Sequence, residues 1–404
     1  MSRPLLALAV ITLSLPALLL AQMGWDQATA SAPWPPRHCL GSLEFGGRIW
    51  VLGGEGSASY NDVWYSTDGT NWFEATPSAA WSPRFKHTVA TLGDRMWIMG
   101  GSSGNLKNDV WYSGDGIDWS EATPAAAWAG RKGHASVTFD SRLWVLGGTT
   151  GTIKNDVWYS TTGDTWEQAT AGADWNPRVN HAVVVFHDTI WVLGGFTGAA
   201  NLNDVWCSCN GTDWTQVTAS AAWSARRGHS VAVLRDTMWL AGGNAGTVYY
   251  NDVWYSVNGA DWVQASPSAP WPARWNHALV AYNDRIWILG GWNQTQVFND
   301  VWYSTGLGGL AANPATTLPG LRLVISPNPV VSHVATVRLV AANALPRVTS
   351  IRVHNATGRV VLHDAITSLP NRFSLDLHGL PAGVYLLRVG TELGFSETQI
   401  LKLR

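Results

Sequence analysis

Apolar and polar positions alternate in short runs along most of the chain, and glycine, asparagine or aspartate separates one run from the next. A run such as "RIWVLGG" at 48–54 is followed by "NDVWYS" at 61–66 and, after a polar turn, by a third short run. Alternation over a few residues predicts β-strands rather than helices. Four strands succeed one another before the pattern starts again, so we expect an all-β protein built from repeated four-stranded units.

Six copies of this unit can be aligned on a Gly-Gly doublet, with a period of 47 or 48 residues. The doublets lie at 53–54, 100–101, 147–148, 194–195, 242–243 and 290–291. An Asp-Gly or Asn-Gly pair, such as 68–69, follows the third strand in most copies and predicts a two-residue type I′ turn before the fourth strand. Units of this size and strand number are typical of propeller blades. The Gly-Gly doublets, the aspartate of the third strand and the regularly spaced tryptophans resemble the kelch repeat, which implies a six-bladed kelch-type β-propeller.

The sixth copy ends at "NDVWYSTG" and has no fourth strand of its own. The segment "GWDQATASAPWPPR" at 24–37 matches "DWVQASPSAPWPAR" at 261–274, which contains the fourth strand and exit loop of the fifth copy. We therefore predict that the N-terminal strand completes the last blade. This pairing removes the exposed sheet edge that an open ring would present.

The two ends of the chain have other roles. Residues 1–21 contain Arg3 and an apolar run, and they predict a secretory signal peptide with cleavage near Ala21. The propeller is expected over 22–304, a Gly-, Ala- and Pro-rich linker over 305–320, and a small immunoglobulin-like β-sandwich over 321–404. The last segment resembles the type A sorting domain of the type IX secretion system, through "SPNP" at 326–329, "GRVV" at 358–361, "LPAGVYLLRV" at 380–389 and a basic end. The alternative is a generic immunoglobulin-like accessory domain.

This resemblance implies a secreted or surface-attached protein whose residues 321–404 engage the secretion machinery. No stretch after the signal peptide approaches the roughly 18 apolar residues of a membrane helix. Residues 22–320 contain 16 Lys and Arg against 24 Asp and Glu, so the propeller lacks the cationic surface that nucleic acid binding uses. The odd number of cysteines, Cys39, Cys207 and Cys209, does not form a complete disulfide framework. Cys207 and Cys209 either pair or remain thiols.

The repeats separate scaffold from site, because a residue present in every copy is explained by the blade. Twenty-four of the 26 tryptophans occupy four positions that recur six times, and we assign them to packing. Only Trp275 and Trp292 fall outside these positions. The loops that carry them, together with Asn276 and Asn293, are expected at the mouth of the central channel, where indoles stack on sugar or aromatic rings and amides bind hydroxyls. The alternative is that these two indoles simply pack under neighbouring loops.

An arginine also recurs once per copy near the same mouth, and six guanidiniums would attract a carboxylate or sulfate. These residues are Arg37, Arg84, Arg131, Arg178, Arg226 and Arg274. Each copy also has one aspartate in its third strand, so internal Arg–Asp pairing explains the same count. Both interpretations remain open from the sequence.

Five histidines recur at the start of the first strand, whereas Leu40 takes this position in the first copy. They are His87, His134, His181, His229 and His277, and we interpret them as structural residues rather than metal ligands. We expect no metal and no cofactor. Side chains found in single copies at the mouth are further candidates for ligand contact: Glu55, Lys86, Lys132, Phe196, Arg227 and Tyr249.

No nucleophile and base stand out above the repeat background. We therefore expect a non-enzymatic module that binds a glycan, a protein or a peptide at the mouth. The kelch resemblance also includes sugar mutarotases and epimerases, and an acid–base residue at the mouth would serve that chemistry. Glu55 is the candidate for this role, with Arg227 or Lys86 beside it.

Overall fold

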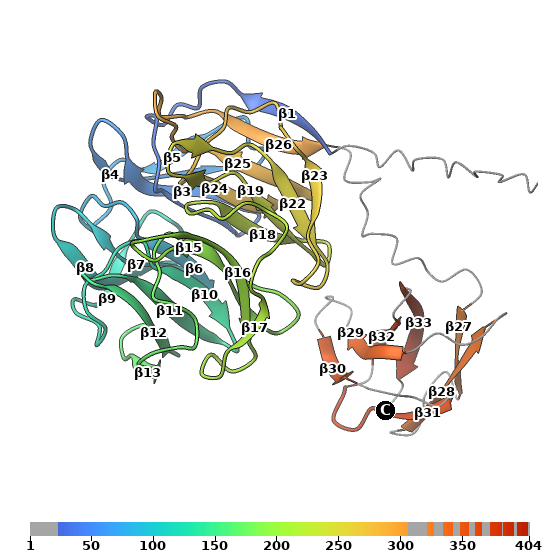
Figure 1. The fold of residues 1–404 in the computed structure, drawn as a ribbon. Helices are drawn as coiled ribbons and strands as arrows, with labels where there is room; N and C mark the ends of the chain where they lie inside the picture. The colour runs from blue at the N-terminus through green and yellow to red at the C-terminus, as the bar shows by residue number, and fades with distance from the viewer. Residues whose placement is uncertain are drawn as a thin grey trace, which may run out of the picture.

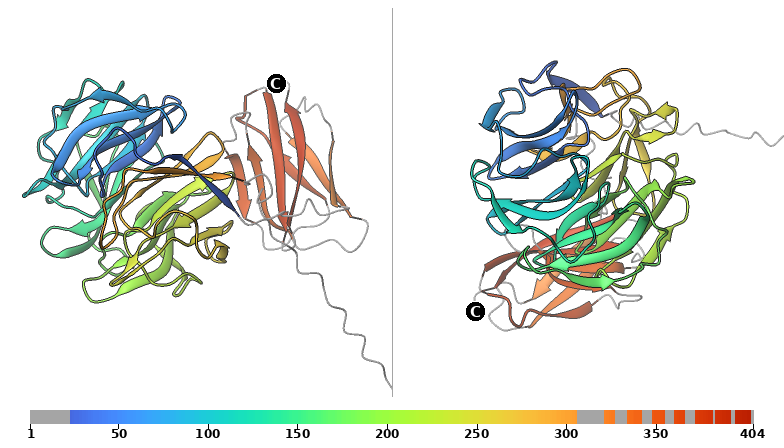
Figure 2. Two further views of the ribbon diagram at one scale, coloured as in Figure 1. Left: turned by 90° about the horizontal axis from the view of Figure 1, so that it is seen from above. Right: turned by 90° about the vertical axis from the view of Figure 1, so that its left-hand side faces the viewer.

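The computed structural model describes residues 23–305 and, in the C-terminal part, 321–326, 334–341, 348–354, 360–365, 372–381, 383–391 and 394–402. All regular elements in these segments are strands. Six four-stranded antiparallel sheets follow one another around a ring (Figures 1 and 2). No helix in the described segments is long and apolar enough to cross a membrane. The expected signal peptide and linker lie outside the described residues.

Each sheet, or blade, runs from an innermost first strand to an outermost fourth strand. Blade one contains β2 (Gly41–Phe45), β3 (Arg48–Glu55), β4 (Ser59–Ser66) and β5 (Phe73–Thr76). Blade two contains β6 (Thr88–Leu92), β7 (Arg95–Ser102), β8 (Leu106–Ser113) and β9 (Ser120–Thr123). Blade three contains β10 (Ala135–Phe139), β11 (Arg142–Thr149), β12 (Ile153–Ser160) and β13 (Glu167–Thr170).

Blade four contains β14 (Ala182–Val185), β15 (Ile190–Phe196), β16 (Asn201–Ser208) and β17 (Thr215–Thr218). Blade five contains β18 (Ser230–Leu234), β19 (Thr237–Ala241), β22 (Val253–Ser256) and β23 (Val263–Ser266), and a short hairpin of β20 (Asn244–Ala245) and β21 (Val248–Tyr249) lies between its second and third strands. Blade six contains β24 (Ala278–Tyr282), β25 (Arg285–Leu289), β26 (Val301–Thr305) and β1 (Gly24–Thr29).

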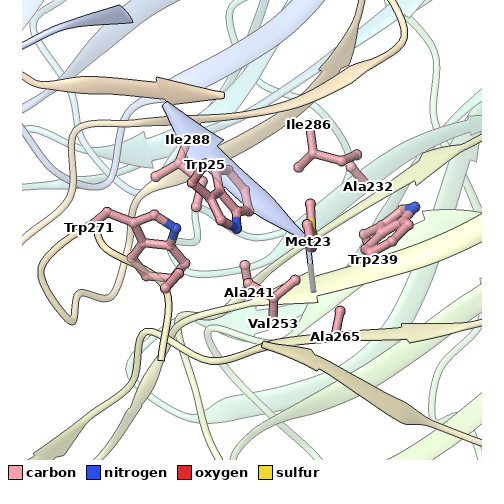
Figure 3. Packing of buried hydrophobic residues seen from close by; sticks show 11 residues of the cluster. Met23, Trp25, Ala232, Trp239, Ala241, Val253, Ala265, Trp271, Ile286 and Ile288 are labelled. Carbon is pink, nitrogen blue, oxygen red and sulfur yellow. The ribbon is translucent and has the colours of Figure 1, made fainter. Parts of the chain in front are cut away.

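The N-terminal strand closes the ring, as the sequence predicts. β1 pairs antiparallel with β26, with Trp25 opposite Ser304 and Gln27 opposite Trp302. Met23 and Trp25 are buried against Trp239 and Trp271 of blade five (Figure 3). The first residues of the described chain therefore belong to the core between blades five and six.

A second closure runs around the central axis. One residue just before each first strand has a positive φ, between 51° and 62°, and its N–H donates to the carbonyl of the corresponding residue in the neighbouring blade over 2.7–3.2 Å. We call these six residues the inner ring: Cys39, Lys86, Gly133, Asn180, Gly228 and Asn276. Their hydrogen bonds form a complete circle, so the six blades are joined at the channel independently of β1.

The recurring tryptophans pack between blades. The exit-loop indole of each copy contacts the fourth-strand indole of the next blade edge to face, with ring centroids 5.7–6.1 Å apart. The pairs are Trp34–Trp72, Trp81–Trp119, Trp128–Trp166, Trp175–Trp214, Trp223–Trp262 and Trp271–Trp25. All twelve side chains are buried, which confirms their assignment to the scaffold.

The predicted type I′ turn between the third and fourth strands is wrong. Gly69 has a positive φ but Asp68 does not, and the loop extends from Thr67 to Trp72. Asp68 Oδ1 instead accepts hydrogen bonds from the N–H groups of Thr70 and Asn71, so aspartate stabilises a longer loop by local side-chain bonding. Type I′ geometry occurs between the first and second strands, for example at Gly46-Gly47, where both φ values are positive.

The C-terminal part contains two antiparallel sheets. One is formed by β27 (Leu321–Ser326), β28 (Val334–Ala341) and β31 (Arg372–Asp376), and the other by β30 (Val360–Ala365), β29 (Val348–His354), β32 (Gly383–Thr391) and β33 (Gly394–Lys402). Val337, Ile351 and Leu387 are among its buried residues. The antiparallel strands agree with the sequence-based expectation, whereas their immunoglobulin-like arrangement stays a prediction.

Candidate binding site at the mouth of the channel

Six pairs of residues cross the blades at one face of the ring. Each pair joins the loop before the first strand to the residue that follows the Gly-Gly doublet, through an isolated antiparallel bridge. These rim pairs are His38–Glu55, Phe85–Ser102, Lys132–Thr149, Val179–Phe196, Arg227–Asn244 and Trp275–Trp292. The backbone arrangement repeats in every blade, while the side chains differ from blade to blade. The expected meeting of these two loops at one face is therefore present.

A cavity of about 200 Å³ lies at the inner ring, where the channel opens. All six inner-ring residues line it, followed by Leu40, Ser230 and the five recurring histidines. Lys86, Asn180 and Asn276 contribute polar side chains, whereas Gly133 and Gly228 contribute none. An added Cβ on Gly228 would lie 2.7 Å from the Asn276 side chain, so the glycine makes room for this amide.

The two tryptophans outside the repeat pattern are in contact. The rings of Trp275 and Trp292 have centroids 5.7 Å apart and planes inclined by 40°. Trp292 also contacts His38 of blade one and Tyr249 of blade five, at centroid distances of 5.7 and 6.3 Å. Both indoles are only partly buried, so they pack together and still present ring surface at the mouth.

Three cations at the mouth lie over aromatic rings. The Arg227 guanidinium carbon is 4.4 Å from the Phe196 centroid and 5.5 Å from that of Trp275. Lys86 Nζ is 5.8 Å from the Trp275 centroid, and Lys132 Nζ is 5.4 Å from that of Phe85. Among the described residues, no carboxylate lies within 4 Å of these three cations, in contrast to the recurring arginines.

The six recurring arginines are not ligand residues, which corrects one of the two interpretations above. Arg37, Arg84, Arg131, Arg178, Arg226 and Arg274 are at most 1% exposed. Each forms two hydrogen bonds of 2.6–2.9 Å with its third-strand aspartate, and a third with the carbonyl of the first doublet glycine, as Arg37 does with Asp62 and Gly53. Burial acts to raise the pKa of Asp109, but the Arg84 guanidinium outweighs it and holds that pKa below its usual value. Internal pairing therefore occupies the arginines.

The recurring histidines are also structural. Burial, and then the charge of Arg84, lowers the pKa of His87 to about 3, so the ring is neutral at physiological pH. The ring faces the backbone of Leu52 and Arg84, but neither nitrogen reaches hydrogen-bond geometry. Within the described segments, no three His, Cys, Asp or Glu side chains are grouped closely enough to hold a metal ion.

The remaining candidates have smaller roles in the geometry. Glu55 Oε2 is 3.9 Å from His38 Nε2, and burial followed by the charge of Lys86 lowers the His38 pKa to about 4. Asn293 Oδ1 accepts hydrogen bonds from the N–H groups of Thr295 and Gln296, so this amide stabilises its own loop. All three cysteines are free thiols, and burial raises the pKa of Cys39 to about 12. Cys39 is thus a poor nucleophile.

Sequence reasoning missed Cys39, Asn180, Phe85 and His38 at the mouth. Cys39 and Asn180 become visible when the copies are aligned on the residue before the recurring histidine, where glycine and asparagine predominate, and His38 and Phe85 lie one residue earlier in the same alignment. Both residue types tolerate positive φ, and this preference is the signal that marks the inner ring.

Comparisons with known families agree with this architecture. Residues 133–305 match the KLHDC2/KLHL20/DRC7 Kelch-repeats domain, and residues 324–402 match the Secretion system C-terminal sorting domain. A solved structure entitled "Structure of YjhT" is similar with a TM-score of 0.57 and 16% sequence identity, over 68% of this chain and 96% of that one. At this identity the similarity shows the fold alone. No curated protein matches the chain.

Proposed function

Since this chain carries a kelch-repeat propeller and a type IX secretion sorting domain, and is secreted or attached to the cell surface, we propose that its propeller is a binding module whose mouth recognises a glycan or a peptide. The rim pairs are the observation that carries this proposal. Six copies hold the same backbone bridge, yet no two copies present the same pair of side chains. Constant backbone with variable side chains around one opening is the arrangement of a recognition surface.

The aromatic contacts support ligand binding rather than packing alone. Trp275 and Trp292 belong to no repeated packing position and are partly exposed, and the Asn276 amide and the Trp275 ring both lie against Gly228, 2.7 and 2.8 Å from where its Cβ would be. Indole faces stack on sugar or aromatic rings, and amides bind hydroxyl or peptide groups. A ligand that contacts both would be oriented at the channel opening.

We predict that Trp275→Val and Trp292→Thr each weaken ligand binding about tenfold or more, because a buried stacking contact of this kind contributes roughly 1.5 kcal/mol. Val179 and Thr149 occupy the same registers in other blades, so both substitutions suit the scaffold. The measurement is binding of the mature full-length chain to a glycan and peptide array, followed by titration of each hit.

Phe73→Thr is the matched control, since Phe73 is 52% exposed on the outermost strand of blade one and Thr215 begins the corresponding strand of blade four. This control should bind as the native chain does. Native binding by both tryptophan variants would contradict a site at the mouth.

The alternative function is a kelch-type sugar mutarotase or epimerase. The observation in its favour is the place of Glu55 at the rim, with its carboxylate beside His38. This alternative requires turnover of a sugar anomer or epimer that is lost in Glu55→Gln. Binding without turnover by the native chain favours the non-enzymatic module.

A further inference from the structure

The mouth differs in charge from the rest of the propeller. Residues 22–320 contain more acidic than basic side chains, and the six buried arginines are neutralised by their aspartates. The rim pairs and the inner ring nevertheless contain three cations, Lys86, Lys132 and Arg227, against the single carboxylate of Glu55. An acidic body with a cationic opening directs anions toward the mouth.

The three cations are positioned but not neutralised. Aromatic rings hold Arg227 between Phe196 and Trp275, Lys86 over Trp275 and Lys132 over Phe85. A cation–π contact orients a charged group without supplying an opposite charge. The Nε of Arg227 is buried and has no hydrogen-bond partner in the described part of the chain. This arrangement is suited to a carboxylate, which accepts charge-assisted hydrogen bonds from guanidinium and ammonium groups.

The same tryptophan joins the cations to the stacking surface. Trp275 contacts Arg227 and Lys86, and it contacts Trp292. A ring stacked at these indoles would therefore have a substituent within reach of both cations. The cavity beside them presents the amides of Asn180 and Asn276, which bind hydroxyl groups.

The backbone of the rim argues against an extended peptide. Trp275 and Trp292 exchange two hydrogen bonds, of 3.0 and 3.1 Å, and the inner-ring N–H groups are all used in the circle. A peptide that binds as an added strand needs unpaired main-chain groups at a sheet edge. Recognition at this mouth therefore depends on side chains, which is compatible with a carbohydrate.

We propose that the mouth selects carbohydrate whose ring bears a carboxylate, as in a glycan containing uronic acid. This inference rests on the proposed function, because it names the ligand class of the same site. Arg227 and Lys86 bind the carboxylate, Lys132 adds to the positive charge of the mouth, and Trp275 with Trp292 stacks on the ring.

The test compares polygalacturonate with its methyl-esterified form, which retains the sugar and loses the charge. The mature full-length chain should bind the acid form about tenfold more tightly or better at low salt, and the preference should shrink as ionic strength rises. The triple variant Lys86→Asn, Lys132→Val and Arg227→Val should lose the preference. Asn180 and Val179 occupy these registers in blade four, so the variant should show native thermal unfolding.

Arg285→Gln is the matched control, since Arg285 also lies over an aromatic ring, 4.2 Å from the Tyr303 centroid, but begins a second strand at the opposite end of the blade from the rim. It should keep the full preference for the acid polymer. Equal binding of both polymers, or of poly-glutamate and polygalacturonate, would overturn the inference and leave a mouth that binds neutral glycans or peptides. Binding that is unaffected by Trp275→Val and Trp292→Thr would overturn the proposed function itself.

Discussion

The role of a residue in this chain depends on whether the same residue type occupies the same position in every blade. Arg131 occupies the recurring arginine position of its blade, and Arg227 occupies the next position along the chain in another blade. The side chains are identical, yet Arg131 is 1% exposed and paired with Asp156. Arg227 instead lies at the rim over two aromatic rings. Desolvation of a guanidinium is unfavourable unless a carboxylate and carbonyl oxygens satisfy it. The buried position supplies both groups, whereas the described residues supply neither a carboxylate nor a carbonyl hydrogen bond to the guanidinium at the rim position.

We expect Arg131→Gln to lower the free energy of unfolding by about 3–5 kcal/mol, because the change leaves the Asp156 carboxylate mostly buried without its guanidinium. Urea unfolding of the mature chain measures the effect. Arg227→Val should change stability by less than about 1 kcal/mol, because Val179 takes the same register in blade four and the described residues place no carboxylate within 4 Å of this guanidinium. Similar losses in both variants would mean that Arg227 also belongs to the scaffold.

At the scale of elements, β1 completes blade six, although almost the whole propeller separates it in sequence from its partner strand β26. It pairs with β26, and Trp25 contacts Trp271 of blade five edge to face at 5.9 Å. Such long-range closure is costly in chain entropy until the ring is nearly formed. The strand is therefore the last part of the propeller that we expect to become stable.

Deletion of residues 22–29 removes β1 and uncovers the edge of β26. We expect this variant to associate through the open edge and to be cleaved by protease near blade six, because unpaired strand edges template intermolecular pairing. Size-exclusion chromatography and limited proteolysis report both effects. A synthetic peptide covering 22–37 should restore the monomer, and a deletion variant that stays monomeric and resistant would argue against closure by this strand.

At the scale of the whole molecule, five buried neutral histidines surround the channel. The pKa of four of them, His87, His134, His229 and His277, is lowered to about 3 by burial and by the adjacent arginine, and that of His181 is also well below its ordinary value. Between pH 6.5 and 3 the unfolded chain binds protons that the folded ring does not. Stability is therefore complete above about pH 6.5 and decreases as the pH falls toward 3.

We predict that the free energy of unfolding decreases as the pH falls from 7 to 5, by roughly 1 kcal/mol per pH unit for each histidine that the unfolded chain protonates. Urea unfolding at pH 7, 6 and 5 measures the slope. His229→Leu places at this position the residue type that Leu40 supplies in blade one. It should reduce the dependence of the free energy of unfolding on pH by the contribution of one proton. A free energy of unfolding that stays constant from pH 7 to 5 would show that the histidines titrate normally.

The amino-acid sequence by itself determined the repeated blade, the closing strand and the sorting domain. Each of these follows from local alternation, recurring glycine and tryptophan, or a short motif, and such signals survive in one dimension because the same contacts recur at a fixed period. The recurrence also separated Trp275 and Trp292 from the other tryptophans.

Only the tertiary structure decided whether the recurring arginines pair internally, which turn type joins the strands and which residues form the mouth. Whether Arg37 pairs with Asp62 or faces a ligand depends on how deeply the side chain is buried. Both interpretations require the same residues at the same spacing, so the sequence does not distinguish them. The type I′ prediction failed at Asp68 because its side chain bonds to the following backbone. The inner ring stayed hidden because a positive φ imposes a weak preference on residue type, while the circle of hydrogen bonds exists only after six distant segments meet at one axis.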